Sequence, residues 1–335
     1  MQKKVNIIIW GFVILLATGI GIAYFTKKNQ FQLYKRNLFY MDTYIEVRIY
    51  SKDKEKAEQA LDGVEAIYKE YHQLSDPYKK YDGLTNVHTI RYNRKRDAYL
   101  KIDKKLYQMI EYGLEWMEKS DGKLNIGLGQ VIDCWKKYRE LKNGVPSKEE
   151  LEALKVDTEI ILKDGDSILN NHPAIDLGSI AKGYATEEAS AYLKKQGMTR
   201  FLINAGGNVE VGLSDSERKY KIGIEDPNTG GVFTIANVTN QSVVTSGGYE
   251  RFYEYQGKKY HHIIHPETLY PADYMKSVTV ITDNSKLGDI LSTTLFLMPI
   301  DEGKKLVENM DGVEAIWYGK DDNITRSKGF KQYES

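Results

Sequence analysis

A carboxylate and a hydroxyl near the carboxyl end of the chain have a spacing that suits cation binding. Asp289 and Thr293 are four residues apart, so on a helix the two side chains share one face. Two oxygen ligands of this kind suit a hard cation such as Mg²⁺. The same spacing is common in helices that bind nothing, so the pair by itself favours a structural interpretation.

A second segment suits phosphate chemistry. Residues 174–183 read Ala-Ile-Asp-Leu-Gly-Ser-Ile-Ala-Lys-Gly, with two glycines around a turn that opens a predicted helix. Free backbone N–H groups at a helix start attract phosphate. Asp176 and Lys182 place a carboxylate and an ammonium at the two ends of this turn. Spacing alone favours an ordinary strand-to-helix connection with two solvated charges.

Three of the six histidines lie within residues 260–266, which read Tyr-His-His-Ile-Ile-His-Pro. On a strand, His262 would project from the face opposite His261 and His265. A histidine so placed can take or give a proton near neutral pH. A zinc site is the weaker interpretation, because His261 and His265 lack an evident third ligand. Exposed strand histidines remain the simple alternative.

Two further segments combine paired glycines with small polar residues. Residues 204–208 read Asn-Ala-Gly-Gly-Asn, and residues 244–249 read Val-Thr-Ser-Gly-Gly-Tyr. Paired glycines permit positive φ or the close approach of a ligand. An ordinary hairpin turn accounts for the first segment, and any tight turn accounts for the second.

The composition is that of a globular protein. The 335 residues include 47 basic and 47 acidic residues, with 41% apolar and 28% charged. This mixture excludes wholesale disorder, and the balanced charge argues against a nucleic-acid partner. The one cysteine, Cys134, excludes an internal disulfide framework and Cys-rich metal sites.

The amino end carries an uncharged apolar run, Val5–Phe25. About twenty helical residues span the roughly 30 Å core of a bilayer, whereas a cleaved signal peptide has a shorter apolar region and a small-residue cleavage site. We therefore predict a single membrane helix within residues 1–28, with a cleaved signal peptide as the alternative. The scarcity of cysteine agrees with an extracytoplasmic body, although the basic residues that follow the run oppose it.

The predicted helices and strands that must position these segments do not alternate regularly along the sequence. Tyr44–Tyr50 alternates as a strand, and Ser147 with Glu150 forms a capping box after Pro146. Further predicted helices are 54–73, 104–119, 180–195 and 285–297, and further strands are 201–204, 220–224, 233–238, 277–281, 252–255 and 259–264, the last two forming a hairpin. This order predicts an α+β fold with a mixed, largely antiparallel sheet and packed helices. No linker divides residues 29–335, so we predict one compact domain.

Together and in this order, the segments resemble those of the ApbE-type flavin transferases, the FAD:protein FMN transferases, from about Phe39 to Tyr318. The resemblance begins at Met41-Asp42-Thr43, continues through Gly122–Trp135, and is closest at Asp176–Gly183. The segments 204–208, 245–249 and 289–293 follow in the family order.

The resemblance implies an activity. Such enzymes bind FAD as a substrate together with a divalent cation, usually Mg²⁺. They transfer FMN to a Thr or Ser hydroxyl of an acceptor flavoprotein and release AMP. With the predicted membrane helix, it also favours a body on the extracytoplasmic side of the cell membrane.

The resemblance also implies roles for individual residues. Metal ligands would be the side chains of Asp289 and Thr293 and the backbone oxygens of Ser179 and Ser292. His262 would accept the hydroxyl proton. The residues that would contact the flavin nucleotide are Met41, Tyr78, Lys123, Leu124, Asn125, Asp176, Lys182 and Ile263.

Four positions depart from the family pattern. His265 stands where the family usually has Asp, Asn125 where many members have Asp, Leu269 where Gly is common, and Gly288 where Ala is common. The loss of a negative charge at His265 keeps open a catalytically impaired, membrane-tethered FAD-binding protein. An FAD pyrophosphatase, in which water replaces the acceptor hydroxyl, is a further alternative, and a structural surface protein would bind neither FAD nor Mg²⁺.

Overall fold

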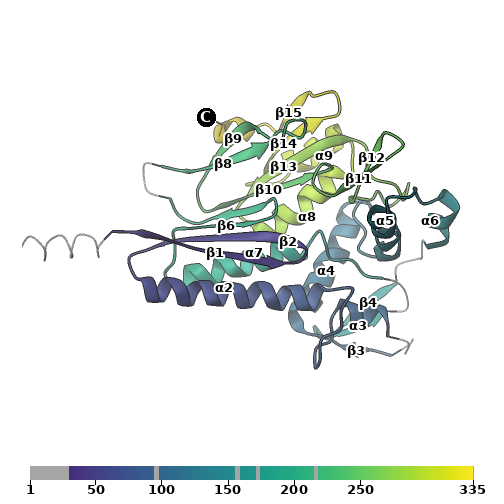
Figure 1. Cartoon of the computed structure of the whole chain (residues 1–335), viewed down its shortest axis with the longest axis horizontal. Coiled ribbons are helices and arrows are strands. Elements are labelled where there is room, and N and C mark those ends of the chain that lie inside the picture. Colours follow the sequence, from purple (N-terminus) through teal and green to yellow (C-terminus); the bar gives the residue numbers. More distant parts are fainter. Residues whose placement is uncertain (1–29, 94–97, 155–158, 171–173, 215–217, 335) are drawn as a thin grey trace, which may run out of the picture.

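The computed structural model describes residues 30–93, 98–154, 159–170, 174–214 and 218–334 (Figure 1). The apolar run Val5–Phe25, and with it the predicted membrane helix, lies outside these residues. Within the described ranges, no helix is long and apolar enough to cross a membrane.

An eight-stranded sheet forms the centre of the fold (Figure 1). Its order is β1-β2-β6-β7-β10-β13-β14-β15, and each neighbouring pair is antiparallel. The strands are β1 (Gln32–Tyr40), β2 (Thr43–Ser51), β6 (Phe201–Ala205), β7 (Asn208–Val211), β10 (Gln241–Gly247), β13 (Met275–Thr282), β14 (Glu314–Gly319) and β15 (Ile324–Arg326). The predicted α+β fold with a largely antiparallel sheet is confirmed.

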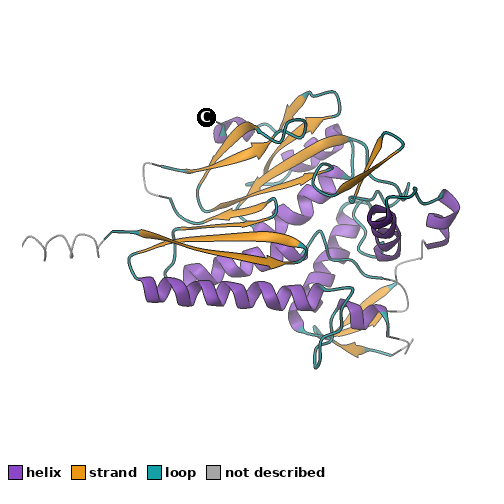
Figure 2. Ribbon diagram, viewed as in Figure 1, coloured by secondary structure: helices purple, strands orange, loops and turns teal. Residues whose placement is uncertain are grey.

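Helices cover one face of this sheet (Figure 2). Side chains alternate across the strands, so Val278 and Val280 of β13 point into the main core beneath the helices. Ile281, the next residue, belongs to the core on the other face. The helices of this layer are α2 (Lys54–Ser75), α4 (Lys104–Lys119), α7 (Ala181–Lys195), α8 (Ser285–Phe296) and α9 (Ile300–Glu308).

A hairpin covers the opposite face. Strands β8 (Tyr220–Glu225) and β9 (Val232–Val238) pack their buried side chains against alternate residues of β7, β10, β13 and β14. The short 3₁₀ helix η1 (Phe330–Tyr333) closes this second core with the fully buried ring of Phe330. Strands β7, β10, β13 and β14 are therefore covered on both faces, whereas β1 and β2 leave Phe39 and Tyr44 exposed.

A third apolar cluster lies around Trp135. The indole ring is 5.6 Å from the ring of Tyr260 in a stacked arrangement, and its Nε1 donates to Leu269 O at 2.7 Å. This cluster joins α5 (Gly129–Leu141), α6 (Lys148–Leu154), β11 (Phe252–Tyr255) and β12 (Lys258–His261). A small sheet, β3 (Leu100–Lys101), β5 (Ser167–Asn170) and β4 (Ile160–Lys163), and helix α3 (Val87–Arg91) complete the described elements.

Two predictions of elements were wrong. The predicted strand 259–264 ends at His261, because the chain turns back there: His265 N donates to Tyr270 O, and Ile264 forms only an isolated bridge with Pro271. The strand alternation that we expected for His262 therefore does not apply. Residues 244–247, interpreted as part of a loop, belong to β10.

Candidate functional site

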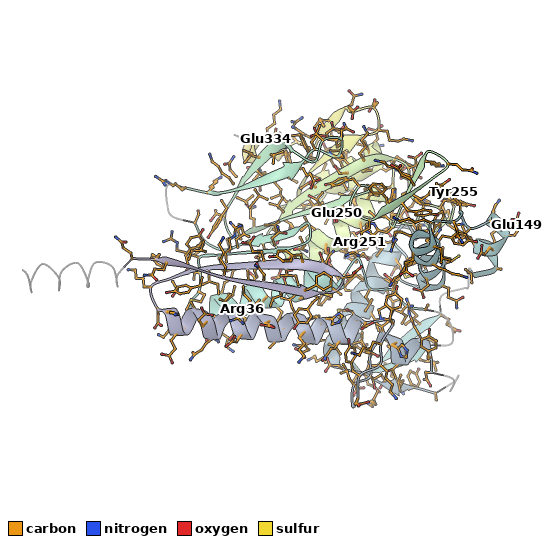
Figure 3. All side chains as sticks on the ribbon, viewed as in Figure 1. Arg36, Glu149, Glu250, Arg251, Tyr255 and Glu334 are labelled. Atoms are coloured by element: carbon orange, nitrogen blue, oxygen red, sulfur yellow. The ribbon has the colours of Figure 1, made fainter. Side chains whose placement is uncertain are left out.

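Some of the predicted residues lie in four segments that contacts or nearby charges join. These segments are the first turn of α7, the middle of α8, the turn between β1 and β2, and the residues that follow β12. Figure 3 shows Glu250 and Arg251 close to the turn end of the β1–β2 hairpin and to α8. We begin with Asp289 on α8, because its contacts are the most numerous.

Asp289 is buried, with 3% of its surface exposed, and both carboxylate oxygens are bound. Oδ2 accepts from the backbone N–H of Gly183 at 2.7 Å, and Oδ1 accepts from Lys182 Nζ at 3.1 Å. Helix α7 has no side-chain cap of its own at Ile180. Asp289 therefore caps α7 from the neighbouring helix, where a negative charge also complements the helix dipole.

Gly183 makes this contact possible. A Cβ at this position would lie 2.6 Å from Asp289 Cβ and 2.7 Å from the carbonyl oxygen of Ser285. Any side chain would therefore push α7 away from α8. The glycine that sequence analysis associated with phosphate chemistry has a second purpose, the close packing of the two helices.

Hydroxyl groups surround the next turn of α8. Ser292 Oγ and Thr293 Oγ1 donate to Asp289 O at 3.0 and 3.3 Å. Ser246 Oγ of β10 lies 2.9 Å from Ser292 Oγ and 3.4 Å from Thr293 Oγ1. Sequence analysis noted the segment that contains Ser246 but did not assign this residue to the site.

This donor set fits a hard cation. It offers one carboxylate and several hydroxyl oxygens, and such ligands suit Mg²⁺ better than softer metals. In the described part of the chain, no group of three His, Cys, Asp or Glu residues could hold a metal ion. A cation at Asp289 would therefore take its other ligands from hydroxyl and backbone oxygens. Ser179 lies in the turn just before α7.

His262 is a half-buried, neutral imidazole. Its Nδ1 is buried and has no hydrogen-bond partner among the described residues. Desolvation, the positive charges of Arg251, Arg139 and Lys182, and the neighbouring His261 together lower the pKa of His262 to about 3. Negative charge that entered the site would raise this pKa again.

The cations around His262 indicate an anionic ligand. Burial lowers the pKa of Arg139, and the nearby charge of Arg251 adds to that effect. Like charges held this close repel each other. A ligand that carries phosphate would relieve this repulsion. Neither arginine was assigned to the site from the sequence, because their proximity arises only in the fold.

The β1–β2 turn places Met41 at the site. Tyr40 pairs with Thr43, so Met41 and Asp42 form a two-residue turn with φ values of 52° and 55°. Turns of this kind normally carry Asn-Gly or Asp-Gly, because other residues are strained at positive φ. The turn is held by Arg251 Nη2, which donates to Asp42 O at 2.6 Å, and by Met41 N, which donates to His72 Nδ1 at 3.3 Å.

A second network joins two predicted nucleotide contacts. Tyr78 Oη donates to Asp133 Oδ1 at 3.1 Å, and Arg91 Nη1 donates to Asp133 Oδ2 at 2.7 Å. Arg91 Nη2 lies 3.8 Å from Asp176 Oδ2. Burial raises the pKa of Asp176, while the Gly178 N–H and Arg91 oppose that rise. The fold thus brings Tyr78 and Asp176 together through Arg91 and Asp133, which sequence analysis missed.

The remaining predicted nucleotide contacts are two polar residues, Lys123 and Asn125, and two buried apolar residues, Leu124 and Ile263. Lys123 Nζ donates to Glu267 Oε1 at 2.9 Å, and Asn125 Oδ1 accepts from Gly127 N at 2.8 Å. Leu124 and Ile263 are 3% and 7% exposed, and their side chains belong to the main core. A ligand could therefore meet these two residues only through their backbone.

His265 stabilises a turn. Its Nδ1 accepts from Glu267 N at 3.2 Å, and its Nε2 lies 3.4 Å from Tyr274 Oη. Burial lowers the pKa of His265, which favours the neutral form that this contact with Glu267 requires. Leu269, in the same turn, has a φ of 61°. Both departures from the family pattern thus lie at turn positions, and the common glycine at 269 suits this positive φ.

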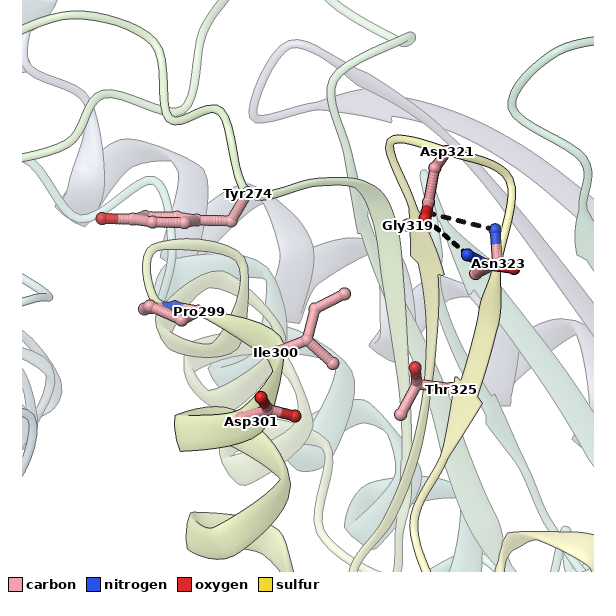
Figure 4. Close-up of a pocket in the computed structure, with 8 residues that line it drawn as sticks. All are labelled: Tyr274, Pro299, Ile300, Asp301, Gly319, Asp321, Asn323 and Thr325. Carbon is pink, nitrogen blue, oxygen red and sulfur yellow. Dashed lines mark hydrogen bonds between the residues drawn. The ribbon is translucent and has the colours of Figure 1, made fainter.

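An open pocket of about 400 Å³ lies apart from these groups, between α9, β14 and β15 (Figure 4). None of the predicted site residues lines it. Tyr274, which also contacts His265, is on its rim. The lining residues are Tyr274, Pro299, Ile300, Asp301, Gly319, Asp321, Asn323 and Thr325.

Comparison with known proteins identifies the family. The model of the ApbE family matches residues 41–317. An FAD:protein FMN transferase of Klebsiella pneumoniae is 32% identical over 235 residues, covering 68% of this chain and 72% of the relative. One of Treponema pallidum is 27% identical over 350 residues, covering 97% and 95%. The crystal structure of the ApbE protein of Thermotoga maritima superposes with a TM-score of 0.81 at 28% identity, covering 91% of this chain and all of that one. The chain therefore belongs to the ApbE family.

Proposed function

We propose that this protein is an FAD:protein FMN transferase. It would move the FMN part of FAD to a Thr or Ser hydroxyl of an acceptor flavoprotein and release AMP. The observation that carries the proposal is His262, whose Nδ1 has no hydrogen-bond partner among the described residues, near the cations Arg139, Arg251 and Lys182, the last of which pairs with Asp289. The relatives are FAD:protein FMN transferases, which supports the same activity.

The residues of the chain suit each part of this transfer. The acceptor oxygen bonds to the phosphorus on the flavin side, the bond from that phosphorus to the bridging oxygen breaks, and AMP leaves with this oxygen. The hydroxyl proton passes to His262. Arg139, Arg251 and Lys182 balance the negative charge of the pyrophosphate, and that charge in turn raises the pKa of His262 toward the range of a useful base.

The cation site of the proposal is centred on Asp289. The side chains of Asp289 and Thr293 and the backbone oxygens of Ser179 and Ser292 would hold Mg²⁺. A cation bound there would neutralise charge on the pyrophosphate.

The proposed location follows from the amino end. Residues 1–28 would form a single-pass anchor in the cell membrane, and the domain of residues 29–335 would lie on the extracytoplasmic side. A cleaved signal peptide would export the same domain without an anchor.

The test is a transfer assay with the purified full chain, FAD and Mg²⁺, with and without a flavoprotein that carries an acceptor threonine. We expect AMP to form only with the acceptor and in equal amount to the flavin bound to it. Replacement of the acceptor threonine by valine is the matched control. AMP formed without acceptor would indicate an FAD pyrophosphatase instead, and FAD binding without AMP would contradict both activities.

A further inference from the structure

We propose that Lys182 occupies the cation position at Asp289 when no metal is bound, and that it moves to the substrate phosphates when a divalent cation displaces it. The inference rests on the proposed function, because it assumes a metal-dependent reaction with a phosphate substrate. According to this inference, the side chain of Lys182 couples the binding of the metal to the binding of the substrate phosphates.

The geometry at Asp289 separates a permanent contact from a replaceable one. The Gly183 N–H is part of the backbone of α7 and lies 2.7 Å from Oδ2, so it cannot leave without moving the helix. Lys182 Nζ ends a flexible side chain and lies 3.1 Å from Oδ1. Oδ1 is therefore the oxygen that a metal could take.

The two members of this ion pair differ in exposure. The side chain of Lys182 is 21% exposed, whereas that of Asp289 is 4% exposed. Lys182 is thus the more accessible member of the ion pair, and the side chain that can move into solvent when a cation takes its place.

A metal and the ammonium cannot share this oxygen. Mg²⁺ binds carboxylate oxygens at about 2.0–2.1 Å, which is well inside the hydrogen bond that Lys182 makes. The two positive charges would then repel each other strongly at close range. The single negative charge of Asp289 cannot stabilise both the metal ion and the ammonium group at such short range. Lys182 must therefore leave when the metal binds.

The displaced ammonium has a destination nearby. The charge of Lys182 contributes to the lowered pKa of His262 and offsets part of the rise that burial causes in the pKa of Glu250, so the side chain lies within electrostatic range of the proposed phosphate site. Rotation about its side-chain bonds would keep it among Arg139, Arg251 and the substrate. Metal binding therefore prepares a phosphate ligand, and by linkage the substrate phosphates favour metal binding.

The test measures metal affinity without substrate. Lys182→Met keeps an unbranched, flexible side chain, one atom shorter, and removes the charge. We would titrate the full-length wild type, Lys182→Met and Asp289→Asn with Mg²⁺ by calorimetry in the absence of FAD. Lys286→Met is the matched control. It removes the same charge from a lysine of α8 whose ammonium lies over the ring of Tyr184.

We expect Lys182→Met to bind Mg²⁺ at least about ten times more tightly than the wild type, because no ion pair must be broken first. Lys286→Met should match the wild type, and Asp289→Asn should bind no Mg²⁺. If Lys182→Met is too unstable to titrate, Mg²⁺ should raise its melting temperature more than that of the wild type.

Two outcomes would overturn the inference and can be told apart. Equal or weaker binding by Lys182→Met, with the loss still seen in Asp289→Asn, would reject the role of Lys182 and leave the proposed metal site intact. Absence of Mg²⁺ binding in the wild type and in Lys182→Met would reject the inference together with the metal site of the proposed function.

Discussion

His262 shows how far the fold can shift the chemistry of one residue. An ordinary histidine titrates near pH 6.5, whereas burial and three neighbouring cations lower the pKa of His262 to about 3. In the folded chain the imidazole therefore stays neutral well below neutral pH. The unfolded chain protonates it as soon as the pH falls below about 6.5.

This difference predicts how stability depends on pH. Between pH 6.5 and 3 the unfolded state binds more protons than the folded state, so the free energy of unfolding falls as the pH falls through this window. His262→Gln removes that proton uptake. We expect urea unfolding at pH 7.5 and pH 5 to show a smaller loss of stability for His262→Gln than for the wild type. An equal loss would contradict the neutral imidazole.

The same variant tests the proposed base. We expect His262→Gln to bind FAD but to transfer FMN about 10²–10⁴ times more slowly, which is the usual contribution of a general base. Unchanged transfer in the assay above would assign proton acceptance to another group.

His265 carries a separate prediction, because its contact is one that an aspartate can also make. A carboxylate at this position can accept from Glu267 N as the imidazole does. We expect His265→Asp to retain both stability and transfer activity, and His265→Leu to lose about 1 kcal/mol in urea unfolding. Activity that appears only in His265→Asp would instead support the catalytically impaired FAD-binding protein.

At the scale of elements, the contact between α7 and α8 determines whether Asp289 is in place. We expect Gly183→Ala to destabilise the chain by about 1–3 kcal/mol and to weaken Mg²⁺ binding, because a methyl group has no space there. Gly231→Ala is the control, since its nearest neighbour, Thr229 Oγ1, would lie at 3.4 Å from the new Cβ and its φ is not positive. Chemical unfolding and calorimetry measure the two effects, and equal results for the two variants would exclude the packing argument.

The β1–β2 turn is the second decisive element. Met41 has a φ of 52°, a conformation that costs most residues about 1–2 kcal/mol and that Asn tolerates better. We expect Met41→Asn to raise the melting temperature and at the same time to weaken FAD binding, measured by fluorescence titration. A rise in stability with unchanged FAD affinity would show that the strain at Met41 has no role at the site.

At the scale of the molecule, the fold does not require a bound cation, because Asp289 is already paired with the Gly183 N–H and with Lys182. The two cores on either side of the central sheet contain apolar side chains and no predicted metal ligand. We therefore expect EDTA to stop AMP release while the circular dichroism spectrum of the chain stays unchanged, and added Mg²⁺ to restore the activity. Unfolding on chelation would contradict this prediction.

Local patterns predicted many of the elements. The helix at 104–119 has the predicted bounds, because its apolar spacing is regular and Asp103 caps it by accepting from Lys105 N. Strand β1 was missed, because its sequence includes Lys35 and Arg36 and resembles a loop. In the fold, Arg36 lies over α2 and donates to Glu58, Asp62 and Glu65 (Figure 3). The acidic partners of Arg36 lie on a helix 22 to 29 residues further along the chain, so local patterns do not show them.

The sequence by itself determined the family resemblance, the α+β class and the candidate residues, because motifs and periodicity are local properties of a chain. The tertiary structure decided which of these residues meet. Asp289 and Gly183 are 106 residues apart, and Arg251 lies 209 residues from Asp42, whose carbonyl oxygen accepts its hydrogen bond. Contacts over such separations, and the burial that keeps His262 neutral, arise only when the sheet brings its helices and turns together.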